Sequence, residues 1–170
     1  MKKLLLLVAA LSLVATLAAC GGGSDKDDVV FNWNIGADPR TLDPGLNGAS
    51  DGGDVINQTF EGLVREINGE IYLGIAEEIV TSPDGLTVTF NLRESKWSDG
   101  SDLTADDFVY SWLRAMNPET ASEYSWIWDY TNVEGSSEFA GSASEDDAVL
   151  DGLAADVGVV SQDNGATLVV

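Results

Sequence analysis

Histidine is missing from this sequence of 170 residues, and cysteine occurs once, as Cys20. Without histidine the chain can form no Ser-His-Asp triad, no Cys-His pair and no imidazole metal ligand. One cysteine cannot close a disulfide within the chain. These absences argue against hydrolysis by an activated nucleophile, and we expect no catalytic residue, no metal site and no cofactor.

Basic residues are also scarce. The chain has 8 Lys and Arg residues against 29 Asp and Glu residues, which gives a formal net charge of -21. Removal of Lys2 and Lys3 with the N-terminal leader described below leaves 6 basic residues against 29 acidic ones, a charge of -23. Such a surface repels nucleic acid and anionic lipid headgroups. We therefore expect no nucleic-acid partner.

The acidic runs do not have the spacing of a calcium site. An EF-hand loop needs oxygen ligands at alternate positions, a central glycine and a terminal glutamate. Neither residues 99–102 (DGSD) nor residues 106–107 (DD) fit that pattern. Paired carboxylates are also the groups of a glycosidase, but acids are so frequent here that nearness in sequence selects no pair. We interpret these runs as solvated surface.

The first 28 residues have the features of an export signal and a tether. Two lysines precede an apolar run over residues 4–17, which is too short for a normal membrane anchor, and LAAC follows at residues 17–20. This pattern resembles a bacterial lipoprotein signal, which implies a signal peptide over residues 1–19 and a diacylated Cys20. An ordinary cleaved secretion signal is the alternative. The Gly-, Ser- and Asp-rich residues 20–28 predict a flexible linker.

Residues 82–118 predict a turn, a strand, a second turn and a helix in close succession. SPDG at 82–85 has turn chemistry, and apolar residues alternate with polar ones over residues 86–92, as in a strand with one buried face. After a turn at residues 96–100, Thr104 and Asp107 form a variant capping box. The helix that begins there should end before Pro118, because the residue preceding proline avoids the α region.

The remaining patterns predict a mixed α and β chain. We expect a strand over residues 29–35, a helix that includes Val55, Phe60 and Val64, and a strand within residues 71–80 that pairs near residues 86–92. A loop over residues 134–147, a short helix over 148–155 and a closing hairpin from residue 157 to 170 complete the series.

Three motifs are less generic than the elements they occupy. GLTVTFNLR (85–93), KWSDG (96–100) and TADDFVYSW (104–112), in this order and spacing, resemble the oligopeptide-binding proteins of ABC importers, which are family 5 extracytoplasmic solute-binding proteins. The resemblance implies a mixed α+β, type II periplasmic-binding-protein-like fold. Residues 29–60 would begin the larger lobe and residues 61–170 would form the inserted small domain, truncated at its C-terminus, with the second lobe absent.

The same resemblance implies ligand-binding residues. Asn47, Gly48 and Ala49 follow the Leu-Asp-Pro motif and match, with a one-residue deletion, a segment that approaches the backbone of the bound peptide. Related binders have an acidic residue where this chain has Asn47, and a polar turn without a ligand role is the alternative. Tyr124 matches a tyrosine that lines the ligand cavity; in this aromatic-rich segment, filling the core is its alternative role.

The family implies binding and delivery without chemistry. We expect a monomeric, extracytoplasmic lipoprotein, anchored to the bacterial membrane through lipid at Cys20, that captures oligopeptides and delivers them to the permease subunits of an ABC importer. Alternative ligands within the family are a dipeptide, a signalling or murein peptide and a chelated metal. An alternative of another class is a surface lipoprotein hydrolase that uses paired carboxylates.

Overall fold

The computed structural model describes residues 30–170. The expected signal peptide, Cys20 and the expected linker lie outside the described residues. The chain divides into two units, residues 1–34 and residues 35–170, and the second contains all the helices and strands described below. Within residues 30–170, no helix combines the length and the apolar character needed to cross a membrane.

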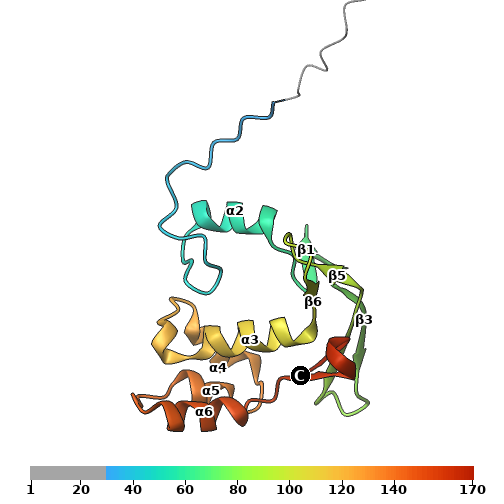
Figure 1. Ribbon diagram of the computed structural model, residues 1–170, viewed down its shortest axis with the longest axis vertical. Coiled ribbons are helices and arrows are strands. Elements are labelled where there is room, and N and C mark those ends of the chain that lie inside the picture. Colours follow the sequence, from blue (N-terminus) through green and yellow to red (C-terminus); the bar gives the residue numbers. More distant parts are fainter. Residues whose placement is uncertain (1–29) are drawn as a thin grey trace, which may run out of the picture. The chain divides into compact units, whose positions relative to one another are not determined.

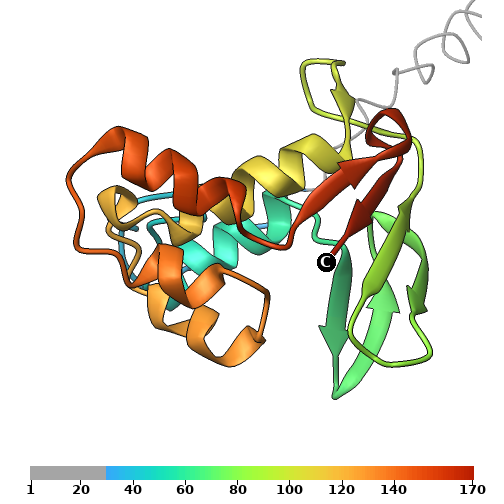
Figure 2. The same cartoon turned by 90° about the horizontal axis from the view of Figure 1, so that it is seen from below.

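A four-stranded antiparallel sheet forms one layer of the second unit (Figures 1 and 2). Its order is β3 (Ala76–Thr81), β4 (Val88–Leu92), β8 (Thr167–Val169) and β7 (Val160–Gln162). Two hairpins therefore meet at the β4–β8 pair, where Thr89 faces Val169. A strand from residues 71–80 was expected to pair near residues 86–92, and it does so as β3 with β4. The closing hairpin is also confirmed, as β7 with β8.

Helix α3 (Ala105–Met116) packs against β7 and β8. Both hydrogen bonds of the predicted capping box are present between Thr104 and Asp107, and the helix ends at Asn117 before Pro118. Both ends of this helix are confirmed. The first and last residues of α3 are fully buried, as is Leu168 of β8, so the helix and the sheet share one core.

Short helices form the other side of this core. They are η1 (Pro118–Thr120), η2 (Ser125–Ile127), α4 (Trp128–Thr131), α5 (Ser136–Ala140) and α6 (Asp147–Ala155). The loop predicted for residues 134–147 is partly wrong because α5 lies inside it. Phe139 of α5 is 2% exposed, so burial of one aromatic side chain stabilises a helix in a segment of loop-like composition. Helix α6 is confirmed, and Asp146 caps it by accepting from Ala148 N.

Two small hairpins and one further helix complete the unit. β1 (Val64–Ile67) pairs with β2 (Glu70–Leu73), β5 (Ser95–Lys96) pairs with β6 (Asp102–Leu103), and α2 (Ser50–Thr59) precedes them. The helix predicted through Val64 is wrong beyond Thr59, because Phe60 is extended and Val64 pairs with Leu73. Gly74 divides residues 71–80 into two strands where the backbones approach closely: a Cβ there would lie 2.4 Å from Gly62 O.

Two strand predictions fail, each for a different reason. Residues 30–35 form no strand, and none of the strands between residues 64 and 169 pairs with them. A strand needs a neighbour for its backbone hydrogen bonds. Leu86 lies in the turn and is 83% exposed, because the Asp84 carboxylate accepts from the Leu86 N–H and keeps the chain in the turn until Thr87. The strand therefore begins at Val88, and its residues are all half-buried, so the predicted alternation of one buried and one exposed face is not present.

Candidate functional site

The loop before α2, residues 41–49, contains three of the expected ligand-binding residues and is called here the approach loop. Asp43 organises it. The backbone carbonyl of Asp43 accepts from Leu46 N at 3.1 Å and Asn47 N at 3.0 Å, while its carboxylate accepts from Gly45 N at 2.9 Å. A side chain that bonds to its own loop in this way favours a tight turn. The Leu-Asp-Pro motif therefore has a structural use in this chain.

Arg114 attaches the approach loop to the last turn of α3. Its Nη1 and Nη2 atoms donate to the two carboxylate oxygens of Asp43, at 2.9 and 2.6 Å. The Arg114 hydrogen bond, together with the Gly45 N–H, lowers the pKa of Asp43 against the opposing effect of burial. The same contact raises the pKa of Arg114. A bidentate pair of this kind fixes geometry as well as charge.

Asn47 turns its side chain toward the start of α2. Its Nδ2 donates to Ala49 O at 2.9 Å, and its Oδ1 covers Gly52, where a Cβ would lie only 2.1 Å away. The amide thus shapes the entry into the helix, as the polar-turn interpretation of this residue supposed. Contact of Asn47, Gly48 and Ala49 with a ligand stays a prediction.

Tyr124 precedes η2 and is 50% exposed. Its ring packs on Trp126 with centroids 6.0 Å apart, and Trp126 meets Tyr130 edge-on at 5.9 Å. Trp128 instead lies 5.9 Å from Trp112 and packs against the core. In this aromatic segment, the ring that packs against the core is therefore Trp128, whereas Tyr124 presents a face to its surroundings.

Glu123 joins the segment of Tyr124 to the approach loop. Its Oε1 forms an ion pair with Arg40 Nη2 at 2.7 Å. Its carboxylate also covers Gly48, so that a Cβ on residue 48 would lie 1.9 Å from Oε2. The structure thus brings together the two segments that the sequence assigned to one site. Sequence reasoning missed Arg40 and Glu123, because an ion pair across 83 residues leaves no pattern in the chain.

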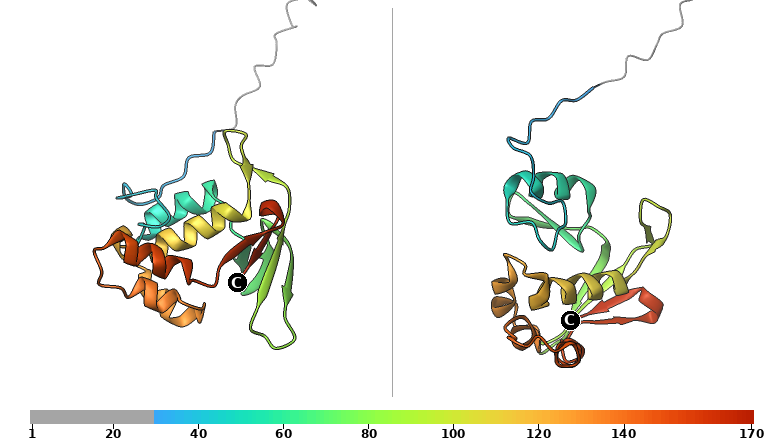
Figure 3. Two further views of the ribbon diagram at one scale, coloured as in Figure 1. Left: turned by 60° about the horizontal axis from the view of Figure 1, so that its bottom comes forward. Right: turned by 60° about the vertical axis from the view of Figure 1, so that its left-hand side comes forward.

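A cavity of about 840 Å³ lies beside this site, within the second unit. Residues of both α2 and α3 line it. The right-hand view of Figure 3 shows these two helices one above the other. Its walls are largely apolar, with Phe60, Trp97 and Trp112 among them, and the Asp43–Arg114 pair borders it. Asn47, Gly48, Ala49 and Tyr124 do not line it. Asp43, Pro44 and Gly45 of the approach loop line the cavity, so this loop borders the cavity and also carries three of the predicted ligand-binding residues.

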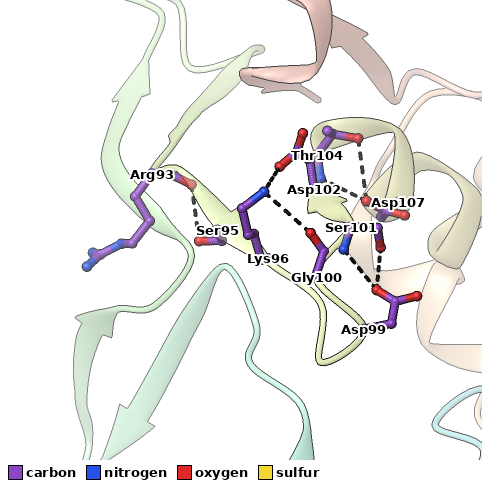
Figure 4. A network of polar contacts seen from close by, with 9 residues as sticks. All are labelled: Arg93, Ser95, Lys96, Asp99, Gly100, Ser101, Asp102, Thr104 and Asp107. Carbon is purple, nitrogen blue, oxygen red and sulfur yellow. Dashed lines mark hydrogen bonds and ion pairs between the residues drawn. The ribbon is translucent and has the colours of Figure 1, made fainter.

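The KWSDG hairpin uses its polar groups within its own turn (Figure 4). Lys96 pairs with Asp102, and Asp99 accepts from the Ser101 hydroxyl and N–H, which lowers the pKa of Asp99. Gly100 has φ +91°, as this turn requires. Over residues 30–170, no three His, Cys, Asp or Glu side chains are grouped so as to hold a metal ion. This motif has a structural role in the hairpin.

Comparison with known sequences places these elements in a family. A sequence model of the bacterial extracellular solute-binding proteins, family 5 (middle region), matches residues 70–164. The chain is 41% identical over 133 residues to the oligopeptide-binding protein OppA of Bacillus subtilis, covering 70% of this chain and 24% of that protein. It is 40% identical over 113 residues to the dipeptide-binding protein of Lactococcus lactis, covering 65% of this chain and 20% of that protein.

Solved structures agree with these matches. Haemophilus influenzae OppA in complex with the peptide RPPGFSPFR superimposes with a TM-score of 0.68 at 35% identity, over 80% of this chain and 25% of that one. The unliganded open form of the murein tripeptide-binding protein MppA gives 0.65 at 35% identity, over 77% and 24%. The chain spans a quarter or less of the length of these relatives, and the mixed α+β, periplasmic-binding-protein-like fold is confirmed. This chain belongs to the family 5 extracellular solute-binding proteins.

Proposed function

We propose that the chain is part of an extracytoplasmic lipoprotein that captures oligopeptides and delivers them to an ABC importer. The observation that carries this proposal is the half-exposed Tyr124 ring, which directly follows Glu123, whose carboxylate lies over Gly48 of the approach loop. An extended peptide offers backbone donors and acceptors along its length, and main-chain contacts bind it without selecting its sequence. An aromatic face adds apolar contact without selecting a particular ligand side chain.

The contacts of this segment are too few to hold a peptide alone. Burying one aromatic face contributes about 1.5–3 kcal/mol, whereas micromolar affinity corresponds to about 8 kcal/mol. In this proposal, the ligand is enclosed between two lobes that close over it. Residues 29–60 begin the larger lobe and residues 61–170 form its inserted small domain. Residues 1–170 alone should therefore bind peptide more weakly than micromolar.

The proposal assigns no chemistry to the chain. Members of this family are binding proteins, and its relatives act outside the cytoplasm. We propose that the protein is monomeric, that Cys20 carries the lipid after removal of residues 1–19, and that residues 20–28 tether the folded part near the permease subunits. A tether of this kind raises the effective concentration of the binding protein at its partner without fixing its orientation.

A different peptide ligand is the second candidate. Its support is that relatives of similar identity include a dipeptide-binding protein and a murein peptide-binding protein. The exposed Tyr124 ring does not distinguish among these ligands, because an aromatic face contacts any of them. Ligand choice would then rest on groups outside the approach loop and Tyr124.

A chimaera tests the proposal directly. Residues 35–170 would replace the matching quarter of Haemophilus influenzae OppA, and RPPGFSPFR would be titrated by calorimetry into the chimaera and the parent. We expect micromolar or tighter binding by both. A chimaera that folds but binds neither RPPGFSPFR nor a set of tri- to pentapeptides would contradict oligopeptide capture. Preferential binding of dipeptides or of murein tripeptide would favour the second candidate.

A further inference from the structure

Glu123 lies where the two segments of the candidate site meet. We infer that Glu123 is a positioning residue that holds Tyr124 in place relative to the approach loop, through Arg40 on one carboxylate oxygen and Gly48 under the other. This inference rests on the proposed function, because it gives Tyr124 its orientation toward the peptide. It assigns specific roles to Arg40, Gly48 and Glu123 that the sequence pattern did not.

The two oxygens of Glu123 reach different parts of the same loop region. Oε1 lies 2.7 Å from Arg40 Nη2, and Oε2 lies over Gly48. Tyr124 is the next residue, and its turn is held locally, since Ser125 N donates to Ser122 O and Ile127 N donates to Tyr124 O. A constraint on the Glu123 side chain is therefore passed to the Tyr124 backbone within one residue.

Gly48 is required for space rather than for its backbone conformation. Its φ lies outside the left-handed region, so an alanine could adopt the same backbone. An alanine Cβ, however, would lie 1.9 Å from Glu123 Oε2 and 2.9 Å from Cδ. The obstructing atoms are the end of a flexible side chain, which can swing away. Gly48→Ala should thus displace Glu123 while leaving the fold intact.

The ion pair is suited to orientation more than to stability. The Arg40 and Glu123 side chains are 79% and 51% exposed. Exposed pairs contribute little to folding and are weakened by salt. Asp43–Arg114, the other contact that fixes the approach loop, leads to α3 and not to Tyr124. Glu123 reaches both sides of this region: it forms the ion pair with Arg40, the residue before the approach loop, and its carboxylate lies over Gly48 within the loop.

Fluorine NMR of the full chain tests this inference without any peptide. The chain has four tyrosines, so incorporation of 3-fluorotyrosine gives four signals, and Tyr124→Phe identifies that of Tyr124. We expect Glu123→Ala and Gly48→Ala each to shift the Tyr124 signal, and the double variant to match Glu123→Ala. Raising sodium chloride should move the wild-type signal toward that of Glu123→Ala and leave the variant unchanged.

Matched controls separate positioning from general effects. Glu119→Ala removes an exposed acid whose side chain has no partner among the residues that the structure describes, 30–170. Gly152→Ala adds a Cβ in open space within α6. Both should leave the Tyr124 signal in place. Glu123→Gln keeps an oxygen that can accept from Arg40 and should shift the Tyr124 signal less than Glu123→Ala. If circular dichroism shows that Glu123→Ala does not fold, Glu123→Gln takes its place.

Two results would overturn the inference. One is a Tyr124 signal that does not change in folded Glu123→Ala. If that variant does not fold, the equivalent result is an unchanged Tyr124 signal both in Glu123→Gln and in the wild type at high salt. The other is a double variant whose shift is the sum of the two single shifts, since independent effects add. Failure of the chimaera to bind peptide would count against the proposed function. The fluorine NMR measurement would still test the role of Glu123, because it uses no peptide.

Discussion

Arg114 and Asp43 stand 71 residues apart and meet through two hydrogen bonds of 2.9 and 2.6 Å. The first belongs to the helix that carries the most recognisable sequence motif, and the second to the loop that carries the expected ligand contacts. The motif-bearing helix therefore does more than complete the core. Its last turn sets the position of the approach loop.

Asp43→Ala should destabilise the protein by about 1 kcal/mol, because it removes the Arg114 pair and the bond from Gly45 N, both partly open to solvent. Urea unfolding measures the difference. Asp38→Ala is the control, because this exposed acid precedes the same loop and has no hydrogen-bonded or ionic partner within residues 30–170. Equal effects of the two substitutions would show that the pair does not stabilise the loop.

The contribution of Asp43 should depend on pH. Its pKa is lowered in the folded protein by Arg114 and Gly45 N. The stabilisation is therefore complete above the unfolded pKa of about 4 and is lost as pH falls through the folded value. Urea midpoints of wild type and Asp43→Asn, measured from pH 7 to pH 2, should converge in acid. Curves that stay parallel would contradict this assignment. The pKa values of Asp84 and Asp99 are also lowered. Both groups are present in wild type and in Asp43→Asn, so their contributions cancel in the difference between the two midpoints.

Tyr124→Ala in the chimaera should weaken RPPGFSPFR binding about tenfold, since half an aromatic ring contributes roughly 1.5 kcal/mol. Tyr72→Ala is a close control, because Tyr72 is 48% exposed against 50% for Tyr124 and lies on β2. Calorimetric titration measures both. If Tyr124→Ala binds as well as Tyr72→Ala, the ring has no ligand contact.

Cys20→Ala should release the protein from membranes, because the expected lipid anchor would have no attachment site. Labelled fatty acid should enter wild type and not the variant, and the wild type should sediment with membranes. If Cys20→Ala still fractionates with membranes and the wild type incorporates no labelled fatty acid, Cys20 carries no lipid.

Salt should raise the thermal unfolding midpoint of the mature chain. The expected charge of -23 after removal of residues 1–19 repels itself, and about 0.1 M salt screens such repulsion beyond roughly 10 Å. A sodium chloride series followed by circular dichroism decides the point. A midpoint that stays level or falls would show that charge repulsion does not limit stability here.

Local signals explain which elements could be predicted. Helix α3 and the turns at Gly85 and Gly100 depend on residues within a few positions of one another, and all three agree with the sequence patterns. The strand predicted at residues 29–35 also had a local pattern, but a strand requires a partner that alternation cannot supply. Phe139 was missed because its burial depends on residues far along the chain.

In the candidate site, too, some residues could be predicted from the sequence and others could not. The sequence pattern selected Asn47, Gly48, Ala49 and Tyr124 by resemblance, and whether they contact a ligand stays a prediction. It could not select Glu123 or Arg40, because their roles arise from an approach between segments 83 residues apart. It also could not show that the Asn47 amide is bonded to Ala49 O. Such details require coordinates.

The central place of β8 has a consequence for the order of folding. Since β8 lies between β4 and β7, the sheet cannot reach its final order until Thr167–Val169 have joined it. Helix α3 and the β3–β4 hairpin can form earlier from neighbouring residues, whereas pairing of Thr89 with Val169 must close a long loop first. Pairings between distant residues are slow to form. The edge of β4 that pairs with β8 therefore stays open until this late pairing forms.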